Sequence, residues 1–362
     1  LGYFSKDSLP LSLLIYSQHF LKMKKYFAIG LSENRVWGTL LVPVMLTEKN
    51  SESFYTVDHT LFPDSKDDDY NLLPHTEKEI VKIINEYNDQ TLFKLFSKEK
   101  SVRDFQDKVK EEKIRDFIRP YIEKRIYRVL EILRHTKIKA FIRDRSRSNV
   151  YDEDFLKIHR ENAEPVFYYT RGEEGSRYSM VLRYRDKTLN ITDQYADILC
   201  EDPAVIRLNR SILFVNNIEG KKIRPFFTKQ FIHIPAKTED AYFKKFLIKI
   251  VREHEVKAEG FIINHLEPSI NTFLDVENGI DNNAVLVLRF SYEKHTILAN
   301  SRFKTFVDLH KERGTYRYDK YSRNEEYEAR VHDFLSDIGL VTFDHANYEI
   351  QGNRKKASRE QL

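Results

Sequence analysis

The chain has almost no cysteine, the residue that stabilises many small secreted or zinc-bound folds, and little tryptophan or methionine. Its 362 residues contain one cysteine, Cys200, together with one tryptophan and three methionines. A single cysteine excludes a disulfide within the chain and a zinc site built on cysteines. This suits a reducing compartment, so we expect a cytoplasmic protein in which Cys200 is a small core residue.

Long apolar runs are missing as well. The most apolar stretch near the start, residues 9–21, is interrupted by two serines, a glutamine and a histidine. It is too short and too polar to fill a bilayer, which takes about 20 apolar residues. It also lacks a basic leading segment and a small-residue cleavage site. We therefore expect neither a membrane span nor a secretory signal.

The common catalytic signatures are absent from the sequence. It contains no G-x-x-x-x-G-K-[ST], no G-x-G-x-x-G, no H-E-x-x-H and no G-x-S-x-G. Two acidic clusters, residues 64–69 and 152–154, lack the spacing of a calcium loop or a nuclease and are typical of solvated loops. We expect no catalytic residue, no metal and no cofactor. A nuclease-like enzyme stays a minor alternative that would need carboxylates converging in one cleft.

The residues that are plentiful predict a folded protein with a densely charged surface. Hydrophobic residues make up 41% of the chain, aromatic residues 13% and charged residues 32%. This length predicts two or three domains. The net charge is only +4, so any affinity for nucleic acid must come from local patches.

The clearest periodic stretch is residues 116–136. Its apolar residues recur at steps of three and four, which is the spacing of a helix with one buried stripe. The stripe consists of Phe117, Ile118, Tyr121, Ile122, Ile126, Val129, Leu130 and Leu133. Pro120 fits the first turn, where its missing N–H costs nothing. We expect this helix to be the packing axis of a helical middle section.

The segments before this helix predict a meander and short helices. Residues 26–29, 36–46 and 54–61 are rich in aromatic and β-branched residues and are separated by turn-like segments. Pro43 predicts that the second strand lies at an edge or a bulge. Thr76 begins a pattern typical of a capping box, which predicts a helix after it.

After residue 163 the residue pattern changes to short apolar runs separated by frequent turn signals, which predicts an all-β unit. Residues 217–220 look like a hairpin loop with a glycine at a positive φ. An amphipathic helix is expected from Thr238, followed by further strands and a last helix that ends near Gly339.

These patterns predict an α+β protein. It has an N-terminal β-meander, a helical middle section, an antiparallel β-rich unit and a C-terminal α+β unit. The expected segments are an upstream extension over 1–22, a meander plus helical domain over 23–145, an all-β unit over 146–236, an α+β unit over 237–353 and a basic tail over 354–362.

Interleaved cations and rings are the one recurrent feature that suggests a ligand. In an exposed strand, rings can stack bases and cations can pair with phosphates. The candidate residues are Arg313, Tyr316, Arg317, Tyr318, Lys320 and Arg323 in one stretch, Lys221, Lys222 and Arg224 in a second, Arg171, Arg177, Arg183 and Arg185 in a third, and Arg143, Arg145 and Arg147 in a fourth. The alternative for each is an ordinary two-faced strand with its rings inward and its charges in water.

Five strings, taken together, resemble a known family. They are MKKYFAIGLSENRVWGTLLVPV from Met23, IRPYIEKRIYRVLEIL from Ile118, EPVFYYTRGEEGSRY from Glu164, GKKIRPFFTKQFIHIP from Gly220 and VKAEGFIINHLEP from Val256. In their residues and in their order along the chain, these segments are similar to the N-terminal accessory region of Swi/Snf-type, superfamily II helicases found in Bacteroidetes. The resemblance covers residues 23 to about 352.

The resemblance implies a role beside a DNA translocase. The ATP-driven motor would follow on the C-terminal side, and its motifs are not in this chain, so no catalytic residue carries over. DNA and the motor of the same parent protein are the implied partners. Alternatively, the chain is a protein-interaction or regulatory module that never touches DNA. That alternative predicts an exposed apolar surface patch.

Overall fold

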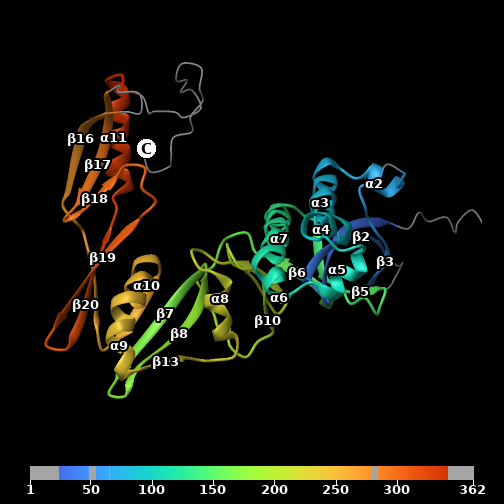
Figure 1. Ribbon diagram of the computed structural model, residues 1–362, viewed down its shortest axis with the longest axis horizontal. Helices are drawn as coiled ribbons and strands as arrows, with labels where there is room; N and C mark the ends of the chain where they lie inside the picture. Colours follow the sequence, from blue (N-terminus) through green and yellow to red (C-terminus); the bar gives the residue numbers. More distant parts are fainter. Residues whose placement is uncertain (1–23, 49–53, 65, 279–283, 341–362) are drawn as a thin grey trace, which may run out of the picture. The chain divides into compact units, whose positions relative to one another are not determined.

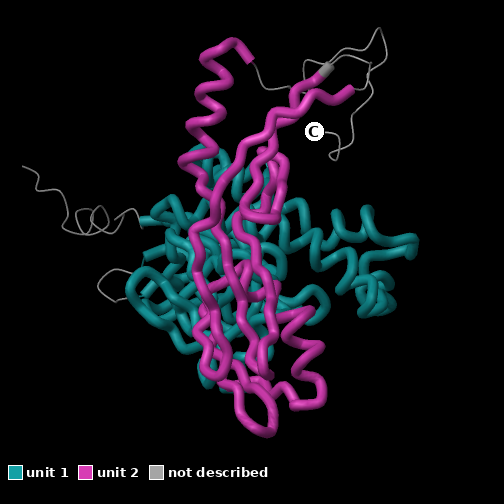
Figure 2. Tube along the Cα trace, turned by 90° about the vertical axis from the view of Figure 1, so that its left-hand side faces the viewer, with its two compact units in different colours: residues 1–165, 180–230 teal, residues 166–179, 231–362 magenta. Residues whose placement is uncertain are grey.

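The computed structural model describes residues 24–48, 54–64, 66–278 and 284–340 (Figure 1). The expected extension over 1–22 and the tail over 354–362 lie outside these ranges. Helices and several sheets alternate along the chain, so the predicted α+β class is confirmed. The chain forms two compact units, coloured separately in Figure 2. Unit 1 comprises residues 1–165 and 180–230, and unit 2 comprises residues 166–179 and 231–362.

Unit 1 begins with the expected meander. Strands β1 (Lys25–Asn34), β2 (Gly38–Glu48) and β3 (Phe54–Thr60) pair antiparallel in chain order. Because β2 lies between the other two strands, Pro43 is not on an edge strand. The register shifts between Met45 and Leu46, so a bulge does lie close to the proline.

The meander belongs to a nine-stranded sheet in the order β10-β11-β12-β6-β4-β1-β2-β3-β5. The additional strands are β4 (Lys139–Ile142), β5 (Asn149–Tyr151), β6 (Phe155–Ile158), β10 (Ala196–Cys200), β11 (Val205–Leu208) and β12 (Ser211–Phe214). The expected separate all-β unit over 146–236 is therefore wrong. Its later strands join the N-terminal sheet because β12 pairs with β6, β6 with β4 and β4 with β1.

Helix α7 (Arg119–Arg134) packs into the main core of unit 1, as expected. Pro120 lies in its first turn, and the stripe from Ile122 to Leu133 is buried. A π-helical turn, η1 (Ile114–Ile118), precedes it. A π turn breaks the 3.6-residue period, so Phe117, expected in the stripe, is 63% exposed instead.

Shorter helices complete unit 1. They are α2 (Asp68–Leu72), α3 (His75–Asn85), α4 (Asp89–Phe96), α5 (Val102–Lys108), α6 (Glu111–Lys113), α8 (Gly220–Ile223) and the 3-10 turns η2 (Asp152–Asp154) and η3 (Arg224–Phe227). Helix α3 starts directly after Pro74, which is its N-cap residue, so Thr76 lies inside the first turn and the expected capping box is wrong. Cys200 is buried among the core residues, as expected.

The segment 217–220 is not the expected hairpin loop, because it leads into helix α8, whose first residue is Gly220. The positive φ of this segment is at Asn217. Ile223 and Phe226 are buried, which anchors the helical turn on the rest of unit 1. Gly220 is buried too, and a Cβ there would lie 2.6 Å from Cγ2 of Ile198. The glycine is therefore needed for close packing and not for a positive φ.

Unit 2 is built around a sheet in the order β13-β8-β7-β14. Its strands are β7 (Glu164–Gly172), β8 (Gly175–Tyr184), β13 (Ile232–Pro235) and β14 (Glu255–Glu259). The last residues of β8, which belong to unit 1, pair with β9 (Lys187–Leu189) of the same unit. One face of the four-stranded sheet packs against the continuous helical segment α9 (Ala236–Tyr242), η4 (Phe243–Leu247) and α10 (Ile248–Glu253).

Two three-stranded sheets and a helix follow in unit 2. One sheet has the order β15-β20-β19, with β15 (Ile262–Leu266), β19 (Thr305–Glu312) and β20 (Thr315–Ser322). The other has the order β16-β17-β18, with β16 (Ile270–Asn278), β17 (Ala284–Tyr292) and β18 (His295–Leu298), and helix α11 (Glu325–Asp337) packs against it. Across the described residues, no helix is both long enough and apolar enough to cross a membrane.

Candidate nucleic-acid interface

The rings of β20 point into unit 2 and not into solvent. Tyr316 is 1% exposed and Tyr318 is 0% exposed. The Tyr316 ring meets Phe243 edge-on at 4.6 Å, and the Tyr318 hydroxyl donates to the carbonyl of Phe243 at 3.1 Å. Stacking bases on these two rings was predicted on condition that the strand is exposed. The helical segment covers them, so that assignment is wrong.

Two cations of the same strand also bind groups inside unit 2. Lys320 is half-buried and donates to the carbonyl of His254 at 3.2 Å, and burial lowers the pKa of its ammonium. Arg323 is buried with Glu328, to which its Nε donates at 2.8 Å. Both cations stabilise the fold of unit 2 and are not presented to a phosphate.

Arg317 and Arg313 lie on the solvent side of the hairpin. Arg317 lies 3.4 Å from the buried carboxylate of Asp319, which also accepts from Asn264 and contacts His310 at 3.2 Å. Arg313 is exposed in the turn between β19 and β20, where it and the following glycine have positive φ. Arg317 therefore neutralises a buried acid, and Arg313 projects from the hairpin turn.

The second predicted patch, on α8 and η3, is exposed but paired. Lys221 and Lys222 both contact Glu219, and Arg224 contacts Glu201. All three cations are more than half exposed. Surface pairs of this kind are weak, so a phosphate could compete for these cations.

The fourth patch lies in the loop after β4 and is tied to unit 1. Arg143 is half-buried and donates to Thr60 at 3.2 Å, and burial followed by the charge of Arg145 lowers its pKa. Arg145 donates to Ser32 at 2.9 Å, and Arg147 donates to Asp154 at 2.6 Å. The structure brings these three arginines together, but each one holds the loop to the sheet.

The β13-β8-β7-β14 sheet of unit 2 presents rings and cations on the face away from the helical segment. Tyr169 and Tyr178 stack at 4.9 Å on the helical side. There the Tyr169 hydroxyl lies 3.3 Å from that of Tyr242, and the Tyr178 ring contacts the Tyr242 ring. Because successive side chains of a strand point to opposite faces, Tyr168 and Arg177 lie on the other side.

Neighbouring strands add to this second face. Lys257 of β14 is the register partner of Tyr168, and His233 of β13 is the partner of Arg177. Phe231, just before β13, lies under the guanidinium of Arg177, with 5.7 Å between the guanidinium carbon and the ring centroid. We call Tyr168, Arg177, Phe231, His233 and Lys257 the open sheet face. All five are exposed.

The cations of the open sheet face differ from those of the predicted patches. No described carboxylate lies within ion-pair distance of Arg177 or Lys257, whereas the other patches are largely paired. The ammonium of Lys257 lies 5.3 Å from the ring centroid of Tyr168. Glu259 and Glu255 lie on the same face of β14, so the face is only moderately basic.

Sequence reasoning singled out Arg177 but missed the other members of this face. The signal was the tyrosine doublet in β7. Adjacent residues of one strand must point to opposite faces, so two consecutive rings, Tyr168 and Tyr169, predict one inside and one outside. Arg171, grouped with Arg177 in the sequence, instead donates to the buried Glu239 on the helical side at 2.9 Å.

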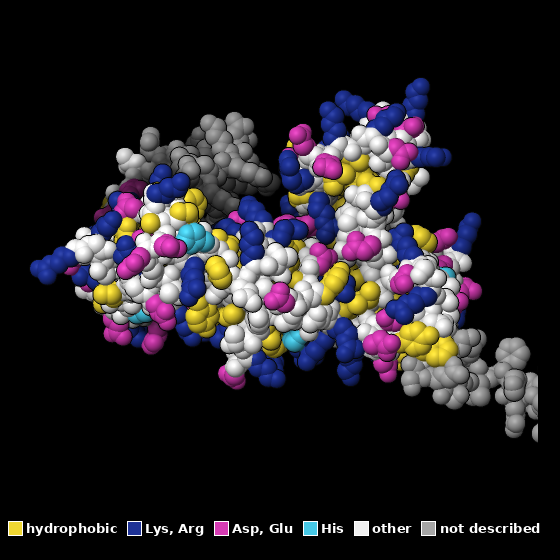
Figure 3. Space-filling view, turned by 90° about the horizontal axis from the view of Figure 1, so that it is seen from below, with side chains coloured by type: hydrophobic (Ala, Val, Ile, Leu, Met, Phe, Trp, Pro, Cys, Tyr) yellow, Lys and Arg dark blue, Asp and Glu magenta, His cyan; other side chains and the backbone are white. Residues whose placement is uncertain are grey.

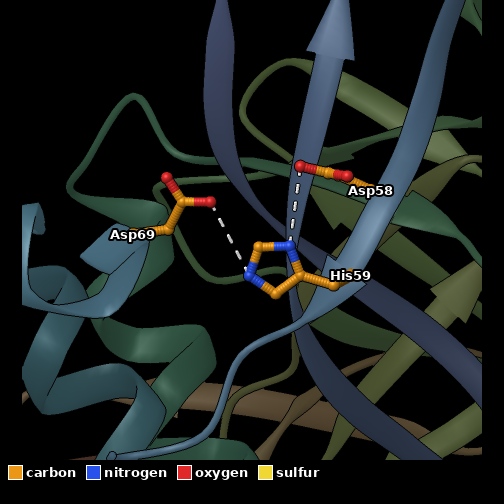
Figure 4. Close-up of side chains that lie close together, drawn as sticks. All are labelled: Asp58, His59 and Asp69. Atoms are coloured by element: carbon orange, nitrogen blue, oxygen red, sulfur yellow. Dashed lines mark ion pairs between the residues drawn. The ribbon is translucent and has the colours of Figure 1, made fainter. Parts of the chain in front are cut away.

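One cluster in unit 1 has the residue types of a metal site. Figure 4 shows His59 between Asp58 and Asp69, with nitrogen–oxygen distances of 3.6 and 3.8 Å. The ammonium of Lys25 lies 3.0 Å from Asp58 and 2.6 Å from Asp69, and its hydrogen bond holds the pKa of Asp58 below its usual value. Lys25 already supplies the positive charge that a metal ion would bring, so we interpret the cluster as a network of ion pairs.

Charge of one sign does not dominate the surface drawn in Figure 3, where Lys and Arg side chains are interspersed with Asp and Glu. This fits the small net charge of the chain. Comparisons with protein-family models, with curated proteins and with solved structures found no match. The Swi/Snf resemblance therefore remains a prediction from sequence.

Proposed function

We propose that this chain is a non-catalytic accessory region of a Swi/Snf-type helicase that contacts nucleic acid through the open sheet face of unit 2. The observation that carries the proposal is the pairing of exposed rings with exposed cations that lack a carboxylate partner. Arg177 lies over Phe231, and Lys257 lies over Tyr168. The Swi/Snf resemblance supplies the parent protein and the translocation activity that this region would assist.

The cations contribute through release of the counterions that surround nucleic acid. Each neutralised phosphate steepens the dependence of affinity on salt, by about 0.9 in log–log slope for duplex and about 0.7 for a single strand. Arg177 and Lys257 need not leave an existing carboxylate first, so their contribution is not reduced by a broken pair. The cations at Glu219 and Glu201 would have to give up a partner.

The test is a salt titration of DNA binding by fluorescence anisotropy with the whole chain. The double variant Arg177→Ala/Lys257→Ala is expected to flatten the log–log slope by about 1.8 with duplex or about 1.4 with a single strand. The control removes the same charge elsewhere, as Lys221→Ala/Lys222→Ala, and is expected to change the slope less. Absence of binding at low salt, or equal losses in both variants, would overturn the proposal.

A second candidate function, docking onto a protein, is favoured by an apolar patch at the far end of unit 2. In the β16-β17-β18 sheet, the cross-strand partners Val276 and Leu286 share one face with Phe290. Phe290 is buried near α11, but Val276 is 71% exposed. We define the apolar patch as Leu274, Val276, Leu286, Phe334 and Ile338, all of them exposed.

Helix α11 contributes to the apolar patch because its core stripe continues beyond the part that packs on the sheet. Phe334 and Ile338 follow Tyr327 by seven and eleven residues, which keeps them on the same helical face. The resemblance places a motor on the C-terminal side of this region, and α11 is the last described element. We propose the motor of the same parent protein as the occupant of the patch.

Calorimetric titration of the chain with the downstream motor tests this second candidate. Val276→Lys and Phe334→Lys are expected to weaken the complex, because each places a charge in the apolar contact. Ile262→Lys, an exposed apolar residue of β15 outside the patch, is the matched control. Unchanged affinity in both patch variants would exclude this docking site.

A further inference from the structure

We infer that the open sheet face takes single-stranded DNA, with unpaired bases stacking on the rings of Tyr168 and Phe231. The inference rests on the proposed nucleic-acid contact and specifies its substrate. Tyr168 is 36% exposed and Phe231 is 50% exposed. Base–ring stacking needs this kind of exposed aromatic surface and tolerates any base.

The ring–cation pairs match the two parts of a nucleotide. Each exposed ring has a cation within 6 Å of its centroid, Lys257 at Tyr168 and Arg177 at Phe231. A base on the ring would therefore have a positive charge nearby for its phosphate. Two such pairs on one sheet fit two nucleotides of the same strand.

The spacing of the pairs follows from the strand order. The two pairs come from the outer strands β13 and β14 and the inner strands β8 and β7. Four neighbouring strands span three spacings of about 4.8 Å, or about 14 Å in all. At the ~3.4 Å per nucleotide by which each strand of a duplex rises, this width corresponds to about four nucleotides.

The same width disfavours duplex DNA. In a duplex the faces of the bases are already stacked, and exposing one requires flipping it out of the helix. A four-stranded face about 14 Å across also does not enter a major groove ~12 Å wide. On duplex, the open sheet face could use its cations but not its rings.

The carboxylates of β14 shift the balance further toward stacking. Glu255 and Glu259 lie two residues either side of Lys257 on the same face. The charge of Glu259 reduces the general attraction for phosphates, so the rings carry a larger share of the affinity. With two unpaired cations, we expect a shallow log–log salt slope of about -1.4 for a single strand.

The experiment measures anisotropy of labelled oligothymidylate and of a mixed-sequence duplex of the same length, with the whole chain. We expect the single strand to bind more tightly. Tyr168→Leu and Phe231→Leu keep an apolar side chain but remove the ring, and each is expected to weaken single-strand binding about 5- to 150-fold. The conservative variant Tyr168→Phe keeps the ring and is expected to bind as the wild type does.

The outcomes separate this inference from the proposed function. If duplex binds as tightly as the single strand, or both leucine variants bind normally, the stacking inference fails while the nucleic-acid contact stands. If neither DNA binds at low salt, both fail. Circular dichroism of each variant shows whether it is folded, and Phe231, which precedes its strand, gives a second reading should Tyr168→Leu not fold.

Discussion

Strands β20 and β7 both carry aromatic rings and lie beside cations, yet the structure uses their rings in opposite ways. In β20, Tyr316 and Tyr318 are buried, and Arg317 on the opposite face pairs with Asp319. In β7, Tyr169 is buried while Tyr168 is exposed beside an unpaired lysine. The alternation of side chains along a strand determines which residues share a face. The helical segment that packs on the sheet determines which face is buried.

The same helical segment covers both strands. Tyr242 contacts tyrosines of β7 and β8, and Phe243 contacts Tyr316 of β20. Rings on the covered side become core, whatever cations neighbour them in sequence. This explains why the most regular basic–aromatic stretch in the sequence is structural, and why a less regular one offers the exposed rings.

The largest expected effect contrasts a covered ring with an open one. Tyr318→Ala removes a fully buried ring and a hydroxyl that donates to Phe243, and we expect it to lower the free energy of unfolding by about 3–5 kcal/mol. Tyr168→Ala should change it by about 0.5 kcal/mol or less, as is usual for exposed positions. Urea denaturation followed by circular dichroism measures both.

Similar losses in the free energy of unfolding for Tyr318→Ala and Tyr168→Ala would contradict the comparison, because Tyr168 would then be part of the core. A normal stability for Tyr318→Ala would show that β20 is not covered. The slope of the denaturation curve should stay unchanged in the exposed variant, since the area exposed on unfolding is nearly the same.

The next effect concerns Arg323, which the sequence placed among the phosphate ligands. Arg323→Met is expected to cost about 3 kcal/mol, near the lower end for a broken buried pair, because the Tyr292 hydroxyl still donates to Glu328. Thermal and urea unfolding measure the loss. If Arg323 served DNA and not the fold, the variant would bind less tightly at unchanged stability.

This pair also predicts a dependence on pH. Burial would raise the pKa of Glu328, but Arg323 and Tyr292 outweigh it, so the pKa is lowered from its ordinary value of 4.5. A lowered pKa in the folded state gives stability that is present above pH 4.5 and is lost as the pH falls through the folded value. Arg323→Met should flatten this acid limb of the stability curve. An unchanged limb would contradict the assignment.

The sequence was sufficient for elements whose pattern is local. The period of three and four placed α7, and short runs rich in aromatic and β-branched residues between turn-like segments placed β1 to β3. The assignment of 146–236 to one unit failed because β12 reaches β6, and β4 reaches β1, across long stretches of chain. No local pattern reports such pairings.

The candidate site was harder to predict for a related reason. Arg177 stood out by its charge, but Phe231, which its guanidinium contacts, is far from it in sequence. Lys257 and Tyr168 join the same face only through the strand order. The exposure of Tyr168 depends on which face the helical segment covers. Only the tyrosine doublet of β7 carried that information locally.

The smallest expected effect sharpens the comparison through charge. Glu259 lies two residues from Lys257 on the open sheet face, about 7 Å away along the strand. At that distance in water a unit charge is worth about 0.6 kcal/mol. Glu259→Gln should therefore tighten single-strand binding about two- to threefold at low salt.

Glu312→Gln, on the hairpin beside Arg317, is the matched control and should leave binding unchanged. The gain must also disappear near 1 M salt, where the screening length falls to about 3 Å. A tightening that persisted there would mean that Glu259 acts through the shape of the sheet. Equal gains in both variants would show that binding responds to the overall charge of the chain and not to the open sheet face.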